Sequence, residues 1–214
     1  MLGFRLIWSA LVLAGIISGQ AIDLGTALSF AVLAGSSVTN TGPSIITGDL
    51  GVSPGTAITG FPPGSVIGEL HSADAVASQA QSDLVTAYNV AAGLPSTPLT
   101  GDLGGRTLVA GFYSFDSSAG LTGTLTLDAQ GNPDSVWVFQ IGSTLTTASN
   151  SDVLLVNGAS ACNVFWQVGS SATLGTGTSF VGSILALTSI TVTTGATNNG
   201  GLYARNGAVT LDNN

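Results

Sequence analysis

Threonine side chains that recur at regular spacing are the main candidates for chemistry in this sequence. Four segments of the C-terminal half place Thr next to an apolar residue, and the apolar residues are Leu145, Leu174, Val192 and Leu211, spaced 29, 18 and 19 residues apart. Each Thr carries a hydroxyl that donates and accepts hydrogen bonds, and its β-branched side chain is stiff at χ1. Such residues at repeated positions favour binding to an extended surface through many weak contacts.

The expected columns follow from the alternation of side chains along a strand. If the four apolar residues point inward, their Thr neighbours point outward in a stack of Thr144, Thr173, Thr191 and Thr210. A second outward column is expected at Thr146, Gly175, Thr193 and Asp212, and a third at Gly142, Ser171 or Ala172, Ser189 and Ala208. A looser copy of the motif is Ser37–Thr41, and another is expected around Leu121–Thr124.

Metal and thiol chemistry find little support. Cys162 is the single cysteine, so no internal disulfide is expected, and its strand-like surroundings predict a buried structural thiol. His71 is the single histidine, and one His with one Cys does not complete a zinc site. We therefore expect no metal and no cofactor.

The acidic residues are dispersed, which argues against an enzyme. A polysaccharide lyase or hydrolase on a β-helix needs clustered carboxylates, or a base with Ca²⁺. Most of the acids are next to Gly, Asn or Ser, where turn formation explains them. Asp102 and Arg106 are close in sequence and are expected to form a loop ion pair.

Composition excludes several partners. Charged residues make up 7% of the 214 residues, the formal net charge is −8, and the three basic residues are Arg5, Arg106 and Arg205. The basic stripe that neutralises phosphates is missing, so neither nucleic acid nor an anionic membrane is an expected partner. A hydrophobic content of 44% with recurring apolar runs argues against disorder.

The first 21 residues are typical of a signal peptide. Arg5 supplies the positive start, residues 6–17 form an apolar run too short to span a bilayer comfortably, and small residues follow at Ser18, Gly19 and Ala21. Cleavage near Gly19–Ala21 would release a secreted domain of residues 22–214, with an uncleaved membrane anchor as the alternative.

One long helix is expected over residues 72–92. Apolar or small residues recur at helical spacing, with Ser72 as the N-cap, Gly93 just past the end, and Pro95 soon after. Its buried face is rich in Ala, so it can lie close against a sheet. The members of that face are Ala73, Val76, Ala77, Ala80, Leu84, Ala87, Tyr88 and Ala91.

The rest of the chain predicts short strands separated by Gly, Asn, Asp and Pro. A coil of about 18 residues with three strands and Gly-rich corners is typical of a β-solenoid rung. The spacing of 29 then indicates an inserted loop, for which residues 157–161 are a candidate. Residues 136–141 and 164–168 are matching apolar copies that predict a face packed on the helix or on the interior.

Several motifs in order make the chain similar to the microbial β-solenoid ice-binding proteins. The motifs that carry the resemblance, which spans about residues 22–214, are Gly48–Asp49–Leu50–Gly51–Val52–Ser53–Pro54–Gly55, Ala73–Asp74, Leu103–Gly104–Gly105–Arg106–Thr107–Leu108, Gly111–Phe112–Tyr113, Trp137–Val138–Phe139–Gln140–Ile141 and Ile184–Leu185–Ala186–Leu187–Thr188–Ser189–Ile190–Thr191.

The resemblance implies a fold, a ligand and a site. The fold is an all-β dominated, right-handed discontinuous β-solenoid of triangular cross-section with one long α-helix alongside, and its N-terminal rung lies beside the C-terminal end. The partner is the surface of an ice crystal, bound by a secreted monomer through one flat face; the alternative is a secreted structural or adhesive module that binds glycan or protein. Relatives often run a little further, so a short C-terminal piece is expected beyond Asn214. The expected site residues are Ser37, Thr39, Thr144, Thr146, Ser171, Thr173, Ser189, Thr191, Thr193 and Thr210.

Overall fold

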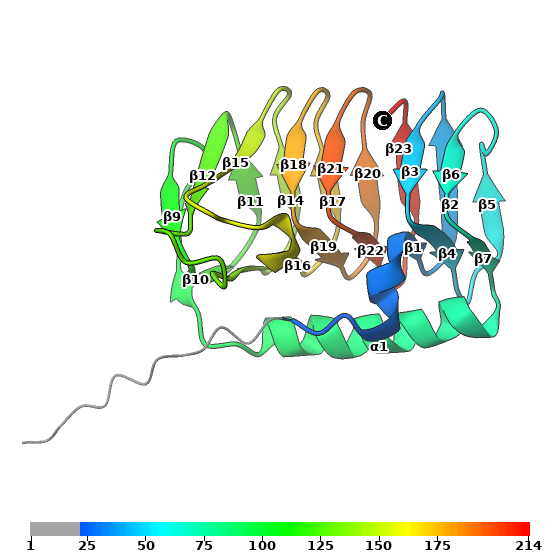
Figure 1. Cartoon of the computed structure of the whole chain (residues 1–214), viewed down its shortest axis with the longest axis horizontal. Helices are drawn as coiled ribbons and strands as arrows, with labels where there is room; N and C mark the ends of the chain where they lie inside the picture. Colours follow the sequence, from blue (N-terminus) through cyan, green and yellow to red (C-terminus); the bar gives the residue numbers. More distant parts are fainter. Residues whose placement is uncertain (1–21) are drawn as a thin grey trace, which may run out of the picture.

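Short parallel strands form the body of the molecule. The computed structural model describes residues 22–214, so the predicted signal peptide lies outside the described residues. The chain passes from one sheet to the next and returns to the first one rung further along, pairing in parallel each time. The result is the predicted β-solenoid, and Figure 1 shows it with one long helix beneath it.

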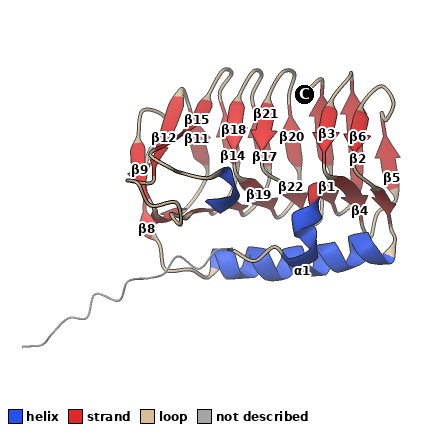
Figure 2. Cartoon of the chain, viewed as in Figure 1, coloured by secondary structure: helices blue, strands red, loops and turns tan. Residues whose placement is uncertain are grey.

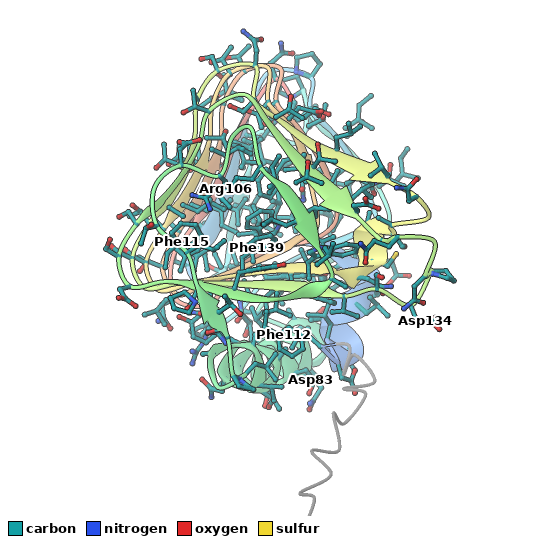
Figure 3. The ribbon with its side chains drawn as sticks, turned by 90° about the vertical axis from the view of Figure 1, so that its left-hand side faces the viewer. Asp83, Arg106, Phe112, Phe115, Asp134 and Phe139 are labelled. Carbon is teal, nitrogen blue, oxygen red and sulfur yellow. The ribbon has the colours of Figure 1, made fainter. Side chains whose placement is uncertain are left out.

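Three sides make up the solenoid, and its end view is triangular (Figure 3). The nine-stranded sheet contains, in chain order, β1 (Phe30–Ala34), β4 (Asp49–Val52), β7 (Leu70–Ser72), β8 (Thr97–Pro98), β10 (Gly111–Phe115), β13 (Trp137–Ile141), β16 (Val164–Val168), β19 (Ser183–Ala186) and β22 (Leu202–Ala204). The seven-stranded sheet contains β2 (Ser37–Thr41), β5 (Ala57–Thr59), β11 (Ala119–Leu121), β14 (Leu145–Thr147), β17 (Ala172–Leu174), β20 (Ile190–Val192) and β23 (Val209–Asp212).

The third side is split into two sheets. Its five-stranded sheet contains β9 (Thr107–Val109), β12 (Thr124–Asp128), β15 (Asp152–Val156), β18 (Ser179–Val181) and β21 (Thr197–Asn199). Its two-stranded sheet contains β3 (Ile45–Thr47) and β6 (Ser65–Ile67). Helical segments are η1 (Gly25–Ser29), α1 (Ala75–Ala92) and η2 (Ala161–Asn163), as Figure 2 shows, and none within residues 22–214 is long and apolar enough to cross a bilayer.

The rungs do not stack in chain order. In the nine-stranded sheet β1 lies between β4 and β22, and in the seven-stranded sheet β2 lies between β5 and β23. The N-terminal rung is therefore joined to the C-terminal rung, which confirms the arrangement that the family resemblance implied.

Aromatic and aliphatic side chains fill the interior. Phe139 and Trp166 occupy paired positions of β13 and β16, and their rings stack with centroids 4.0 Å apart. Phe180 tilts against the Trp166 ring from the third side at 4.9 Å. All three are fully buried, so the interior is a packed apolar core that holds the three sides in fixed positions.

The outer side of the nine-stranded sheet is covered by α1. Its buried residues are Ala77, Ala80, Leu84, Ala87, Tyr88 and Ala91, as predicted, while the expected members Ala73 and Val76 are exposed. Tyr88 donates a hydrogen bond to the Val168 carbonyl at 3.3 Å and accepts one from Gln167 at 2.8 Å. Small Ala side chains let the helix approach the sheet closely, and Tyr88 fixes its position.

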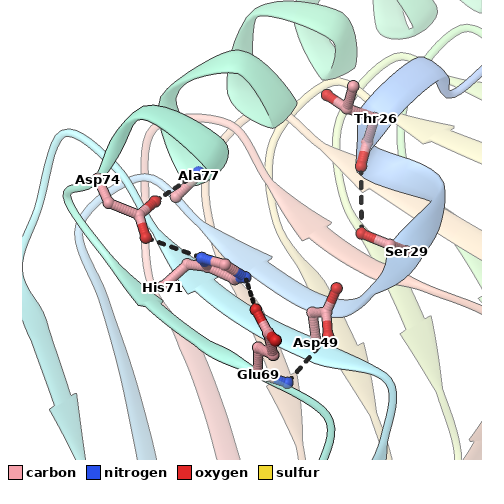
Figure 4. Close-up of polar contacts among 7 residues, drawn as sticks. All are labelled: Thr26, Ser29, Asp49, Glu69, His71, Asp74 and Ala77. Carbon is pink, nitrogen blue, oxygen red and sulfur yellow. Dashed lines mark hydrogen bonds and ion pairs between the residues drawn. The ribbon is translucent and has the colours of Figure 1, made fainter.

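The helix begins later than the sequence indicated, because Asp74 is the N-cap rather than Ser72. An Asp74 carboxylate oxygen accepts from the backbone N–H of Ala77 at 2.8 Å, while Ser72 belongs to β7. The other oxygen contacts Nδ1 of His71 at 2.8 Å (Figure 4). These bonds, led by that from Ala77, lower the pKa of Asp74. Gly93 is the C-cap.

The corners and the long loop explain the irregular rung lengths. Asn150, Gly177 and Gly195 have positive φ where the seven-stranded sheet turns toward the third side. The extra residues lie between β15 and β16, as expected. Within that loop Cys162 is exposed in η2, so the prediction of a buried thiol was wrong: the loop lies outside the core.

Candidate binding face

The outward side of the seven-stranded sheet carries a column of threonines. The strand pairings place one residue of each rung directly beside the next. From one end of the sheet to the other, the column is Gly120, Thr146, Thr173, Thr191, Thr210, Thr39 and Thr59. Six of its seven positions are Thr, each half-buried or exposed.

A second column of small residues lies two positions earlier on each strand, facing the same way. This Ser/Ala column, in which Thr144 is the one Thr, contains Ser118, Thr144, Ser171, Ser189, Ala208, Ser37 and Ala57. Neighbouring strands lie about 4.8 Å apart, and residues two positions apart on one strand are about 6.7 Å apart. The two columns therefore form a flat lattice of short side chains.

Hydrogen bonds hold the small column in place. The Thr144 hydroxyl donates to the Ser118 hydroxyl at 2.8 Å. Ser171 and Ser189 accept from the backbone N–H groups of Ser189 and Ala208 at 3.3 and 3.2 Å. Each bond joins one rung to the next, so the hydroxyls have fixed positions before any ligand arrives.

The inward neighbours of these columns anchor the face to the core. Leu145, Ala172, Ile190, Val209 and Val38 stack between the outward residues, and all are buried. Because alternate residues of every strand are packed, the outward side chains project from a rigid surface.

The two columns contain no charged residue. Charges occur only at their margins, where the Asp212 carboxylate accepts from the Thr194 hydroxyl at 2.6 Å. Asp102 lies at the β11 end and accepts from the backbone N–H groups of Thr122 and Gly104 at 2.8 and 2.7 Å. Burial raises the pKa of Asp102, but these hydrogen bonds outweigh it and lower the pKa below its usual value.

The expected ion pair between Asp102 and Arg106 does not form, because the Arg106 guanidinium instead donates to the backbone carbonyls of Asp102 and Thr100. Within the part of the chain that the structure describes, no three His, Cys, Asp or Glu residues are grouped to hold a metal ion.

All ten predicted site residues lie on or beside this sheet, but the predicted columns were out of register at β14. Leu145 pairs with Ala172 rather than with Leu174, so Thr146, and not Thr144, continues the column of Thr173, Thr191 and Thr210. Side-chain alternation permits a shift of two residues without changing the face. The second predicted column has the same error at β14: Thr146 does not belong to it, whereas Gly175, Thr193 and Asp212 follow residues that are paired in register.

Thr193 lies just beyond β20. Its hydroxyl donates a hydrogen bond to the Leu174 carbonyl at 2.8 Å, so that donor is already engaged within the protein. The rung expected around Leu121–Thr124 instead contributes β11, Ala119–Leu121. Sequence reasoning also missed Thr59, although the alternation of Ala57–Ile58–Thr59 matches that of Ser37–Val38–Thr39, with which it pairs.

A parallel β-solenoid with one helix alongside is the fold of the ice-binding proteins that the chain resembles. The Ice-binding-like family model matches residues 32–214. The chain belongs to this family.

Individual relatives agree in sequence and in fold. An ice-binding protein of Nostoc sp. (strain HG1) is 63% identical over 194 residues, which cover 89% of this chain and 72% of the relative. The crystal structure of an ice-binding protein from an Antarctic biological consortium superimposes with a TM-score of 0.89 and 54% identity, covering 91% and 89% of the two chains. The crystal structure of the ice-binding protein from the Antarctic ascomycete Antarctomyces psychrotrophicus superimposes with a TM-score of 0.88 and 50% identity, covering 91% of this chain and 96% of that chain.

Proposed function

We propose that this protein binds ice through the Thr and Ser/Ala columns of the seven-stranded sheet and so inhibits the growth and recrystallisation of ice crystals. The observation that carries the proposal is the six threonines in seven rungs beside a column of small residues, without a charge on either. The names of the relatives support ice as the ligand.

The lattice has the chemistry to order water. Thr methyl groups favour cage-like water around them, and the hydroxyls anchor that water by hydrogen bonds. Thr is stiff at χ1, so little side-chain entropy is lost on binding. Lys or Glu would bring a much larger entropy cost, which accounts for their absence from the two columns. Many weak contacts acting together then hold the protein on the crystal and block growth between bound molecules.

The proposal extends to the protein's lack of a catalytic role, its oligomeric state and its location. A binding role needs no catalytic group and no cofactor, and the relatives are named for ice binding. We propose that the protein acts as a monomer and that it is secreted after removal of residues 1–21. Secretion is expected because the ligand, an ice crystal, lies outside the cell.

A single substitution on each side of the solenoid tests the face. Thr191→Tyr places a large ring in the centre of the Thr column and should abolish most of the thermal hysteresis measured by nanolitre osmometry. Thr126→Tyr on the five-stranded sheet and Thr86→Tyr on the exposed side of α1 are matched controls and should retain it. Circular dichroism should show all three variants folded.

Two outcomes would contradict the proposal. Full activity in Thr191→Tyr, together with loss in either control, would move the site to another side. Unshaped ice growth with the unsubstituted protein at high concentration would exclude ice binding and favour a module that binds glycan or protein.

A further inference from the structure

One step of the seven-stranded sheet has a shorter ladder than its neighbours. β14 and β17 lie side by side (Figure 1), and their strand pairing has two positions, the second of which joins Thr146 to Thr173. The pairings of β11 with β14 and of β17 with β20 each have three. At the end of the β14–β17 step, where Thr147 would pair with Leu174, another interaction must hold the two strands together.

A side-chain hydroxyl takes the place of a backbone carbonyl at this point. In the rungs on either side, Ala148 and Thr193 donate their backbone N–H groups to carbonyls of the preceding rung, at 2.9 and 3.1 Å. At the equivalent position of β17, the backbone N–H of Gly175 donates instead to Oγ1 of Thr147 at 2.8 Å. The Thr147 hydroxyl therefore makes the connection that the backbone makes in the neighbouring rungs.

The Thr147 hydroxyl belongs to a buried chain of hydrogen bonds. Thr147 and Thr178 are 3% and 1% exposed, and their hydroxyl oxygens are 2.8 Å apart. Thr178 donates its proton to the Ala148 carbonyl at 3.1 Å. Because each hydroxyl has one proton, Thr147 must donate to Thr178. The chain from the Gly175 N–H through the two hydroxyls to the Ala148 carbonyl thus pairs each of these groups, which offsets the cost of burying them in an apolar core.

The two corners joined by this chain approach each other closely. A Cβ atom on Gly175 would lie 2.5 Å from the Thr147 carbonyl oxygen and 2.9 Å from the Ala148 carbonyl carbon, so the glycine is required by the proximity of the two backbones. Thr147 directly follows the outward Thr146, and Gly175 lies two residues after the outward Thr173. The chain therefore fixes where these two outward side chains lie relative to each other.

We propose that Thr147 is a positioning residue of the binding face, whose buried hydroxyl holds Thr146 in register with Thr173. The inference rests on the proposed function of that face. Thr147 points into the core and does not meet the ice, so it acts through the outward threonines of its own strand and the next. Without its hydroxyl, the Gly175 N–H is left unpaired, and the end of β14 is no longer tied to β17.

Two substitutions of Thr147 separate its hydroxyl from its shape. Thr147→Val removes the hydroxyl and keeps the β-branched shape. It should speed amide hydrogen exchange at Gly175 by about tenfold, shift the NMR signals of Thr146 and Thr173, and remove at least half of the thermal hysteresis per folded molecule near 0 °C. Thr147→Ser keeps the hydroxyl and loses a methyl group, so it should be less stable than the unsubstituted chain but retain its thermal hysteresis.

Ser135→Ala is the matched control for lost stability. It removes another buried hydroxyl, which donates to the Ala129 carbonyl at 3.3 Å between β12 and β13, away from the seven-stranded sheet. Both Thr147→Val and Ser135→Ala should lower the melting temperature by about 2–6 °C, but Ser135→Ala should keep full thermal hysteresis. Thr178→Val breaks the same chain from the other corner and tests the proposal if Thr147→Val does not fold.

Full thermal hysteresis in folded Thr147→Val would overturn the proposal and leave Thr147 a role in stability alone. Equal losses in Thr147→Val and Thr147→Ser would also overturn it, because the hydroxyl would not be the group responsible. An unsubstituted protein without thermal hysteresis would instead contradict the proposed function. The NMR measurements use no ice and decide the positioning role in that case: unchanged signals of Thr146 and Thr173 in Thr147→Val would overturn it.

Discussion

The side-chain hydroxyls of Thr39 and Thr210 lie 3.3 Å apart, although 171 residues separate them along the chain. The contact lies where the N-terminal rung joins the C-terminal rung. Because of it, the Thr column continues without interruption from Thr146 to Thr59. The face thus depends on a junction that the order of the sequence does not reveal.

Substitutions at Thr39 distinguish the contribution of the Thr methyl group to ice binding from that of the hydroxyl. Thr39→Val keeps the β-branched shape and should retain more than half of the thermal hysteresis, because the stiff side chain still orders water. Thr39→Ser keeps the hydroxyl but removes the methyl group and the restriction at χ1, so this variant should lose more of its thermal hysteresis than Thr39→Val. Thermal hysteresis at matched protein concentrations gives the comparison. The reverse order would assign the larger contribution to the hydroxyl.

Gly120 is the exception in the Thr column, and the structure gives a reason. A Cβ atom on Gly120 would lie 2.9 Å from an Asp102 carboxylate oxygen, and that carboxylate holds Thr122 and Gly104. Gly120→Ala should therefore disturb these bonds and lower the free energy of unfolding by about 1–2 kcal/mol.

The matched control is Ala57→Ser, an equally small change in the other column at the opposite end of the sheet, which should be neutral. Urea titrations of both variants measure the effect. A Gly120→Ala midpoint equal to that of the unsubstituted chain would show that Asp102 moves aside without cost.

The solenoid class was predictable because its signals are local. Repeated Thr next to apolar residues, Gly-rich corners and one Ala-rich helix each follow from a few neighbouring residues. The helix start was less accurate: Ser72 and Asp74 are both good N-caps, and the choice was made by β7, which includes Ser72.

The register was harder to predict, since it depends on contacts between rungs. Leu145 and Leu174 look equivalent in sequence, yet Leu145 stacks on Ala172, and only the packed interior decides between a large and a small inward residue. Cys162 was misplaced because an apolar run looks the same in a surface loop and in a strand. The seam between Thr39 and Thr210 could not be obtained from the residues alone and came from the family resemblance.

Acid should weaken the attachment of the N-terminal segment to the helix. The Asp83 carboxylate accepts from the Thr26 hydroxyl at 2.7 Å and from its backbone N–H at 2.8 Å, and these bonds lower the pKa of Asp83. A lowered carboxyl pKa stabilises the folded state above the unfolded value of about 3.9, and that contribution is lost as pH falls through the folded pKa.

The melting temperature should therefore fall between pH 5 and pH 2. Asp83→Asn removes the titrating group, so the variant should be less stable at pH 7 and show a smaller decrease over the same range. Calorimetry at several pH values tests this. An identical pH dependence in both proteins would assign acid sensitivity to other carboxylates, such as Asp74 or Asp102.

Substitutions of Trp166 should lower the stability of the protein without changing its binding to ice. The Trp166 ring stacks on Phe139, and its indole N–H donates to the Val181 carbonyl at 2.9 Å. Trp166→Ala leaves a cavity in the packed interior and should cost about 3–5 kcal/mol, which corresponds to a fall of roughly 10 °C in melting temperature for a domain of this size. Trp166→Phe keeps a ring in the stack and should lose less.

Near 0 °C both Trp166 variants should remain folded, and their thermal hysteresis per folded molecule should match that of the unsubstituted protein, because the Thr and Ser/Ala columns lie on the outside of a different side of the solenoid. Thr191→Tyr should show the opposite pattern, with an unchanged melting temperature and lost activity. If Trp166→Ala loses activity while its circular dichroism stays native at low temperature, the flatness of the face depends on the internal aromatic stack, and binding and stability are coupled through the core.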